Sequence, residues 1–157
     1  MSAQPQSRSP RGQPSVNRLA EELRLAVTRL ARRLRQHADE GLSPSQLSAL
    51  STIDRRGPMT LGDVASAERI QPPTVTAAVA RLEEAGLVVR TADERDRRVS
   101  RVAVTPAGAE LLRRSRRAKE AYLARRLAQL EPDDRQVLAR AARLLETVLA
   151  EPREETS

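Results

Sequence analysis

Apolar residues recur at steps of three and four over several stretches of the chain, which predicts a mainly helical protein. The first stretch predicts a helix over about residues 16–39, with an apolar stripe made of Val16, Leu19, Leu23, Val27, Leu30 and Leu34. A second helix should begin at Ser43-Pro44-Ser45-Gln46, which combines an N-cap serine, a proline at the first helical position and a glutamine at the third. It should end near Arg56, ahead of Gly57-Pro58.

Two further helices and a hairpin are predicted in the middle of the chain. Thr60 followed by Asp63 opens a short third helix, and residues 68–71 form a turn. Pro72-Pro73 begins a fourth helix that should end at Gly86 and bury Val75, Val79 and Leu82. Two short helices joined by a tight turn are typical of a helix-turn-helix. Segments 87–89 and 99–104 then read as two short strands around a charged tip.

Two more helices should complete the chain. Thr105-Pro106 begins a long helix to about Leu130, and Pro132 begins a last helix whose apolar positions are Val137, Leu138, Ala141, Leu144, Leu145, Val148 and Leu149. We therefore predict a mainly α fold with a small β-hairpin wing. The predicted segments are a disordered tail over 1–15, an N-terminal dimerisation helix over 16–40, a winged helix-turn-helix over 41–104, C-terminal dimerisation helices over 105–151 and a frayed tail over 152–157.

The charge composition suggests a polyanionic partner, with an alternative explanation beside it. Of 28 basic residues only Lys119 is a lysine, and the formal net charge is +7. However, abundant arginine and alanine with scarce lysine also follow from G+C-rich coding DNA, whatever the function. Residues 60–101 hold seven arginines against seven acidic residues, so the predicted DNA-reading part carries no net charge. Tyr122 is the only aromatic residue, which argues against base stacking on a single strand.

Several classes of protein are disfavoured by what the sequence lacks. Zero cysteines and the single histidine His37 argue against a thiol switch or zinc site, and we expect no metal or cofactor. His37 is more readily a surface or interface residue than a catalyst. No glycine-rich phosphate motif is present, and we expect no enzyme activity. We also expect no membrane span, no secretory signal in the polar first 15 residues, and a cytoplasmic location.

The central residues carry a more specific signature. The matching stretches are Leu42–Leu47, Val64-Ala65, ProProThrValThr at 72–76, ArgLeuGluGluAlaGlyLeuVal at 81–88 with Arg90, AspGluArgAspArgArg at 93–98, and Val104–Gly108. In this joint order the sequence resembles the MarR family of bacterial transcription regulators. Val104 stands where the family usually has leucine. The resemblance implies a winged helix-turn-helix that binds double-stranded DNA and, in many members, a small-molecule effector.

The fourth helix is the predicted recognition helix. With Val75, Val79 and Leu82 turned inward, its outward arc holds Pro73, Thr74, Thr76, Ala77, Ala80 and Arg81. These are mostly small side chains, which let the helix approach the floor of a major groove. Threonine hydroxyls and arginine can hydrogen-bond base edges there, and methyl groups can contact thymine. The alternative is that threonine and alanine merely fill an exposed helix.

The charged tip of the hairpin is the second predicted contact. By resemblance, an aspartate in this signature holds a neighbouring arginine in the pose that enters the minor groove. We assign that orienting role to Asp96 and the insertion to Arg97, with Arg95 and Arg98 as alternates. The alternative is a solvated turn whose local ion pairs contribute little.

The terminal helices predict a second copy of the chain as a partner. Their apolar stripes exceed what the small reading core can cover, and the resemblance implies a two-fold dimer that reads two half-sites of a pseudo-palindrome. Representative interface positions are Leu19, Leu23, Leu30, Leu138, Leu145 and Val148. A monomeric helical cap over the winged domain is the alternative. We expect the protein to be a ligand-responsive repressor. Two alternative functions are a sequence-indifferent architectural nucleic-acid binder and an interaction module that no longer touches DNA.

Overall fold

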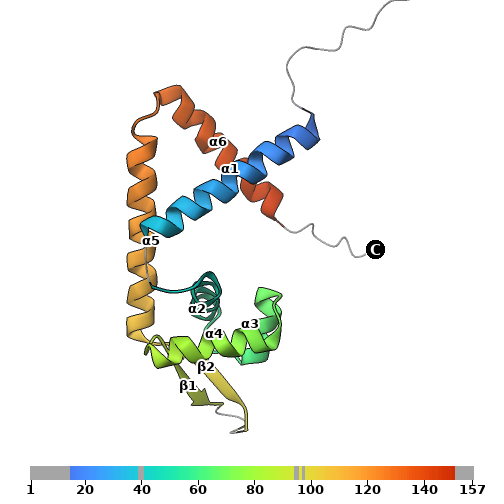
Figure 1. The fold of residues 1–157 in the computed structure, drawn as a ribbon, viewed down its shortest axis with the longest axis vertical. Coiled ribbons are helices and arrows are strands. Elements are labelled where there is room, and N and C mark those ends of the chain that lie inside the picture. Colours follow the sequence, from blue (N-terminus) through green and yellow to red (C-terminus); the bar gives the residue numbers. More distant parts are fainter. Residues whose placement is uncertain (1–14, 39–40, 94–95, 97, 151–157) are drawn as a thin grey trace, which may run out of the picture. The chain divides into compact units, whose positions relative to one another are not determined.

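The computed structural model describes residues 15–38, 41–93, 96 and 98–150. Their contacts divide the chain into two units, with the boundary between Gln36 and His37. The elements are α1 Val16–His37, α2 Pro44–Arg56, α3 Leu61–Glu68, α4 Pro72–Glu84, β1 Val88–Ala92, β2 Ser100–Val104, α5 Pro106–Leu127 and α6 Pro132–Leu149 (Figure 1). The predicted mainly helical fold with one hairpin is confirmed.

The predicted helix starts are present because side chains satisfy the first free N–H groups of each helix. Ser43 and Gln46 form a capping box at α2: the Gln46 N–H donates to Ser43 Oγ at 3.3 Å, and the Ser43 N–H donates to Gln46 Oε1 at 2.7 Å. Thr60 and Asp63 form the equivalent pair at α3, with both bonds at 3.1 Å. These two predictions rested on local chemistry alone, and both are confirmed.

Two predicted helix ends are too late in the chain. Helix α4 ends at Glu84 rather than at Gly86, because Gly86 adopts a left-handed conformation with φ 70°. The N–H groups of Gly86 and Leu87 donate back to the carbonyls of Glu83 and Leu82, both at 2.9 Å, which is the Schellman arrangement. Helix α5 ends at Leu127 rather than Leu130, since residues 129 and 130 donate to carbonyls three residues earlier in a tighter turn.

The hydrophobic core lies in the second unit, between α2, α3, α4 and the base of the hairpin. Helix α5 adds Leu112 to the same cluster. The most deeply buried apolar side chains, each at most 1% exposed, include Leu50, Ile53, Val64, Val75, Val79, Leu82 and Val102. The expected inward face of the fourth helix is therefore confirmed. Helices α1 and α6, in contrast, contain no buried residue within the described chain.

The hairpin is held on both edges of its second strand. Strands β1 and β2 pair antiparallel from Val88 opposite Val104 to Ala92 opposite Ser100. On its other edge, Val102 exchanges two backbone hydrogen bonds with Met59, at 2.8 and 3.1 Å. Met59 lies in the connection between α2 and α3, so the hairpin is attached by its backbone to the helical core.

A tight backbone approach joins the hairpin to α5. The Thr105 hydroxyl donates to the Gly86 carbonyl at 2.7 Å and accepts from the Gly108 N–H at 3.1 Å. A Cβ on Gly108 would lie 2.2 Å from the Leu87 carbonyl oxygen and 2.9 Å from Val104 Cγ1. Only glycine fits at this position without a shift of the backbone.

We predict that Gly108→Ala lowers the free energy of unfolding by about 1–3 kcal/mol, the usual cost of overpacking a tight site. Gly62→Ala is the matched control, because its new Cβ would meet nothing closer than Thr60 Oγ1 at 3.7 Å. That variant should be neutral or up to about 1 kcal/mol more stable, since alanine favours a helix more than glycine does. Urea unfolding of both variants checks this, and equal stabilities would contradict it.

Candidate DNA-binding surface

Helices α3 and α4 and their connection form the helix-turn-helix. Arg69 closes α3 in the left-handed conformation, with φ 54° and ψ 38°, which is uncommon for a residue with a side chain. The N–H of Ile70 donates to the Ala65 carbonyl at 3.2 Å. This turn redirects the chain within residues 69–71, so that α4 can bury Val75 against the same core.

Helix α4 presents its predicted outer face to solvent. The exposed residues are those expected from the helical period, namely Pro73, Thr74, Thr76, Ala77 and Arg81, while Ala80 is half-buried. Ala78 is buried along with the predicted core positions. The arrangement leaves a face of short side chains on a helix whose opposite face is locked in the core.

Two side chains on this face already have partners. The Thr76 hydroxyl donates to the Pro72 carbonyl at 3.0 Å, one turn earlier in the same helix. Arg81 pairs with Glu84 at 3.0 Å, and both side chains are about two-thirds exposed. An ion pair this exposed is weak, so a DNA contact could replace it at little cost.

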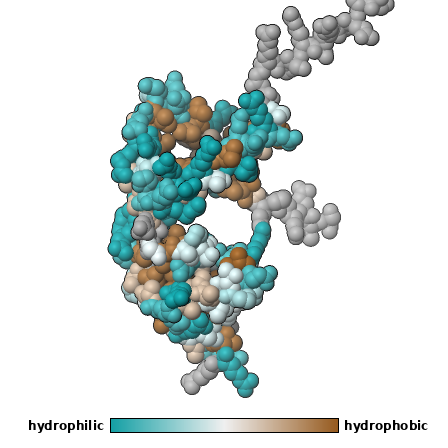
Figure 2. Space-filling view, viewed as in Figure 1, coloured by the Kyte–Doolittle hydropathy of each residue, from teal (hydrophilic) through white to brown (hydrophobic). Residues whose placement is uncertain are grey.

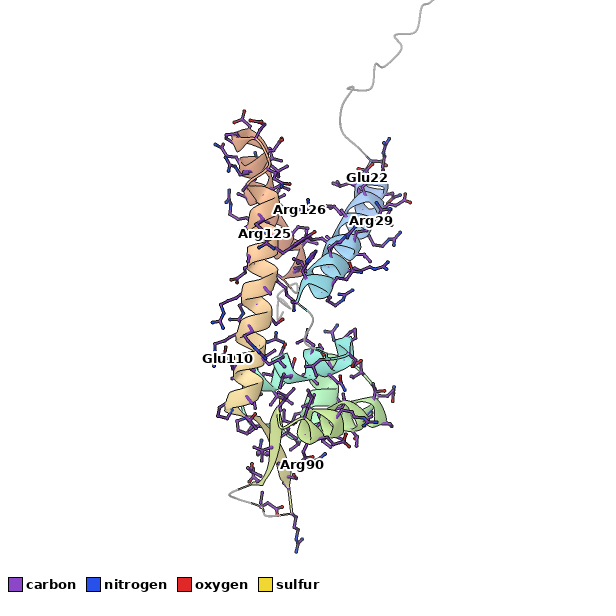
Figure 3. All side chains as sticks on the ribbon, turned by 60° about the vertical axis from the view of Figure 1, so that its left-hand side comes forward. Glu22, Arg29, Arg90, Glu110, Arg125 and Arg126 are labelled. Atoms are coloured by element: carbon purple, nitrogen blue, oxygen red, sulfur yellow. The ribbon has the colours of Figure 1, made fainter. Side chains whose placement is uncertain are left out.

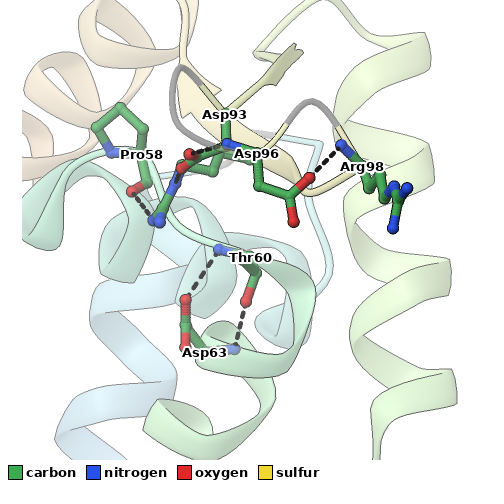
Figure 4. A network of polar contacts seen from close by, with 7 residues as sticks. Pro58, Thr60, Asp63, Asp93, Asp96 and Arg98 are labelled. Carbon is green, nitrogen blue, oxygen red and sulfur yellow. Dashed lines mark hydrogen bonds and ion pairs between the residues drawn. The ribbon is translucent and has the colours of Figure 1, made fainter.

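The hairpin tip is braced by Asp93, a residue that the sequence analysis did not single out. Its carboxylate accepts from the Asp96 N–H at 3.1 Å and pairs with the Arg101 guanidinium. Arg101 also donates to the Pro58 carbonyl at 3.4 Å, in the connection ahead of α3 (Figure 4). Through Arg101, Asp93 at the base of the charged segment is therefore linked to the connection between α2 and α3. The i to i+8 spacing across a predicted hairpin could have suggested it.

The other wing residues are only partly described. Asp96 Oδ1 accepts from the backbone N–H of Arg98 at 2.9 Å, so this carboxylate stabilises the turn itself (Figure 4). Arg98 is exposed. Arg95 and Arg97 lie outside the described residues, and the predicted orientation of Arg97 by Asp96 therefore stays a prediction.

A second ion pair connects the recognition helix with the hairpin. Arg90 on β1 contacts Glu83 of α4 at 2.9 Å between Nε and Oε2. Its side chain is 34% exposed, and that of Glu83 is 41% exposed, so solvent screens this pair less than the Arg81–Glu84 pair. Arg90 is labelled on the hairpin in Figure 3. Glu83 and Asp93 thus hold arginine side chains in place through these two ion pairs. Their negative charges also cancel part of the positive charge of the region.

The capping box of α3 lies close enough to Arg101 for their charges to interact. The Thr60 hydroxyl and then the Thr60 N–H lower the pKa of the Asp63 carboxyl, and the positive charge of Arg101 lowers it further. Hydrogen bonds and the charge of Asp93 raise the pKa of Arg101, which stays protonated. The capping hydrogen bonds from Thr60 are thus the main cause of the lowered Asp63 pKa, and the charge of Arg101 is the smallest.

Helix α5 carries six further arginines outside the helix-turn-helix and the wing. Glu110 accepts from Arg113 at 2.7 Å and from Arg117 at 2.9 Å, and the Arg113 contact lowers the pKa of the Glu110 carboxyl. Arg125 and Arg126 project from the same helix further along (Figure 3).

The Arg126 guanidinium lies 5.6 Å from the Tyr122 ring centroid, and the His37 ring stacks on Tyr122 at 3.9 Å. His37 is exposed, as expected for a surface residue.

The predicted interface positions are largely exposed in this single chain. Leu19, Leu23 and Leu30 of α1 are about two-fifths exposed, Leu138 and Val148 of α6 are 45% and 78% exposed, and Leu145 is half-buried. Hydrophobic residues stand among polar ones on the surface of the terminal helices in Figure 2. Neither terminal helix finds enough cover for its apolar stripe within its own unit.

A hollow of about 260 Å³ lies between α2 and α5, and the sequence analysis had named no residue for it. Its polar lining includes Ser51, Asp54 and Arg55 of α2 and Ser115, Arg116 and Lys119 of α5. Within the described residues no group of three histidine, cysteine or acidic side chains could hold a metal ion. No described helix is long and apolar enough to cross a membrane.

The fold and the exposed helix define a winged helix-turn-helix protein. Residues 42–100 match the MarR family. The chain is 44% identical over 129 residues to the uncharacterized HTH-type transcriptional regulator Mb0904 of Mycobacterium bovis, covering 82% of this chain and 90% of the relative. The chain belongs to the MarR family of transcription regulators, whose members bind DNA through the helix-turn-helix and are not enzymes.

Two further proteins agree with this assignment. The HTH-type transcriptional repressor MdtR of Bacillus subtilis is 26% identical, with 76% of this chain and 81% of that protein covered. A MarR family protein from Bacillus stearothermophilus has a solved structure that is 25% identical and superposes with a TM-score of 0.74. The superposition covers 87% of this chain and 96% of that one.

We predict that the stabilising contribution of Asp63 depends on pH in the acid range. Because its pKa is lowered on folding, this contribution is fully present above the ordinary carboxyl pKa of about 3.9. It is lost as the pH falls through the lowered value. The difference in unfolding free energy between the parent and Asp63→Asn should therefore shrink between about pH 5 and pH 2.

Denaturant unfolding at several pH values measures this difference. Asp134→Asn, which removes an exposed carboxylate from the first turn of α6, is the control for general charge effects. A difference between the parent and Asp63→Asn that stays constant down to pH 2 would show that the capping box does not depend on the charge of Asp63.

Proposed function

We propose that this regulator binds a pseudo-palindromic operator as a homodimer, acts as a repressor, and is released by a small-molecule effector. The observation that carries the sequence-specific part is the exposed face of α4. Pro73, Thr74, Thr76 and Ala77 are exposed on a helix whose other side is rigidly buried. Such a helix can enter a major groove closely without being deformed.

The base contacts proposed for α4 follow from the side-chain groups that this helix still exposes to solvent. Thr74 presents its hydroxyl and methyl to solvent, and Arg81 can exchange its weak pair with Glu84 for the edge of a guanine. Thr76 has committed its hydroxyl proton to the helix, so towards DNA it offers a methyl group and an oxygen that accepts. Ala77 adds a second methyl group.

The wing is the proposed minor-groove element. Arg97 is assigned to insertion and Asp96 to its orientation, with Arg95 and Arg98 as alternates, as the family signature at 93–98 implies. The brace between Asp93 and Arg101 supports this proposal, because it holds the base of the tip to the core while leaving Arg98 in solvent. A base that is held in place reduces the entropy lost when the wing binds DNA.

The homodimer is proposed from the terminal helices. Their uncovered leucines and valines need a partner surface, and a second copy of the chain would supply the same apolar stripes of α1 and α6. The proposed interface positions are those predicted from sequence, Leu19, Leu23, Leu30, Leu138, Leu145 and Val148. A two-fold pair would present two copies of α4 to two half-sites of one operator.

Repression and effector release are the finer parts of the proposal. The name of MdtR, a repressor, supports the direction of regulation. The hollow between α2 and α5, lined by both polar and apolar side chains, is a candidate effector site, since α2 belongs to the DNA-reading core and α5 to the proposed dimerisation part. The partners we propose are double-stranded DNA, a second copy of the chain and a small molecule, in the cytoplasm.

We predict strong sequence discrimination. Duplex fragments selected by the protein from the source genome should bind about 10³- to 10⁷-fold more tightly than random duplex at matched salt, the usual range for specific recognition. Titration of both duplexes against salt checks this. The architectural alternative predicts equal affinities with a steep salt dependence for both, because only phosphates would be contacted.

We predict that charge in the α6 stripe separates the two copies. The double variant Leu138→Glu/Val148→Glu should sediment as a monomer and lose most of its operator affinity, because two glutamates cannot be buried in an apolar interface. Gln136→Glu, an exposed polar position on the same helix, should remain a dimer. Circular dichroism verifies that both fold, and a dimeric double variant would contradict the proposed interface.

A further inference from the structure

The first turn of α4 offers no free backbone donor to a phosphate. Pro72 and Pro73 have no N–H, and the N–H groups of Thr74 and Val75 both point to the Gln71 carbonyl, at 3.0 and 3.4 Å. A helix N-terminus normally binds anions through these groups. Within residues 72–75 of the recognition helix, contact with DNA must therefore be made by side chains.

Gln71 carries the side chain best placed for such a contact. It is the N-cap residue of α4, it is exposed, and its side chain makes no capping hydrogen bond. No other hydrogen bond of its amide occurs within the described part of the chain, whereas its backbone carbonyl accepts the two bonds that start the helix. The amide therefore keeps its donor and its acceptor available without any role in folding.

The side chain of Gln71 is longer than those of the residues that follow it, so it can reach further from the helix. Residues 72–77 are prolines, threonines, a valine and an alanine, so no other long polar side chain lies in this part of the helix. Arg81 lies ten residues further along, roughly 15 Å at 1.5 Å per residue. Recognition helices contact base edges mainly with their N-terminal residues, and in α4 that region contains Gln71.

We propose that Gln71 is a specificity-determining residue that reads an adenine in the major groove. A glutamine amide matches adenine in two places, since Nε2 donates to the N7 atom and Oε1 accepts from the N6 amino group. The thymine paired with that adenine projects its methyl group into the same groove, where the methyl groups of Thr76 and Ala77 form an apolar surface. This inference rests on the proposed sequence-specific binding.

The test is a selection from a pool of duplexes with a randomised 30-base-pair segment, using the full chain. The parent should enrich a half-site with an A·T pair at one fixed position, and Gln71→Ala should lose the preference at that position alone. Gln71→Arg should change the enriched base there to guanine, because arginine matches the O6 and N7 atoms of guanine. Gln129→Ala, an exposed glutamine after α5, should select the same half-site as the parent.

Replacing a single atom of the adenine in the DNA tests the proposed hydrogen bond directly. Replacing that adenine by 7-deazaadenine removes the N7 acceptor and with it one of the two hydrogen bonds, so it should weaken binding of the parent by about 2- to 12-fold and leave Gln71→Ala unaffected. Unfolding curves should show that both Gln71 variants are as stable as the parent.

The outcomes separate this inference from the proposed function. If the parent enriches no sequence, sequence-specific binding itself fails. If the parent enriches a half-site that Gln71→Ala selects with the same base at every position, only the role of Gln71 is overturned. Uniform weakening by Gln71→Ala over all sequences, with a lower salt slope, would also overturn it and assign the amide to a phosphate.

Discussion

The burial of one face of α4 is the constraint on which the DNA-binding surface depends. Val75, Val79 and Leu82 are fully buried against α2, α3 and the base of the hairpin. Because a helix cannot rotate about its axis without removing these side chains from the core, the outward direction of Thr74 and Thr76 is fixed as well. The reading face thus needs no contact of its own to be held in place.

The charged residues of this region hold neighbouring side chains in position more than they attract DNA. Residues 60–101 carry no net charge, and the structure shows where two of the acids are used. Asp93 holds Arg101 at the base of the wing, and Glu83 holds Arg90 between α4 and β1. A surface of this kind gains less from general attraction to phosphates, so discrimination between sequences has to come from groups that meet the bases.

The two kinds of helix in this chain solve different physical problems. Helices α2, α3 and α4 are short, and each is stabilised by caps or by burial in a shared core. Helices α1 and α6 are longer and bury no described residue, although their apolar stripes are regular. Stripes of this regularity without a cover are stable only when another surface removes them from water, which is the physical basis of the proposed homodimer.

The sequence by itself determined the elements, because capping boxes such as Ser43 with Gln46 and the helical spacing of Val75, Val79 and Leu82 are local properties. The same helical spacing also predicted which face of α4 is exposed to solvent. The tertiary structure alone decided the contacts between residues distant in the chain, namely the bond from Arg101 to Pro58 and the approach of Gly108 to Leu87. Local periodicity carries no information about such contacts, since they form only when separate elements pack together. The free amide of Gln71 was likewise visible only in three dimensions, because two prolines and its own carbonyl complete the start of the helix.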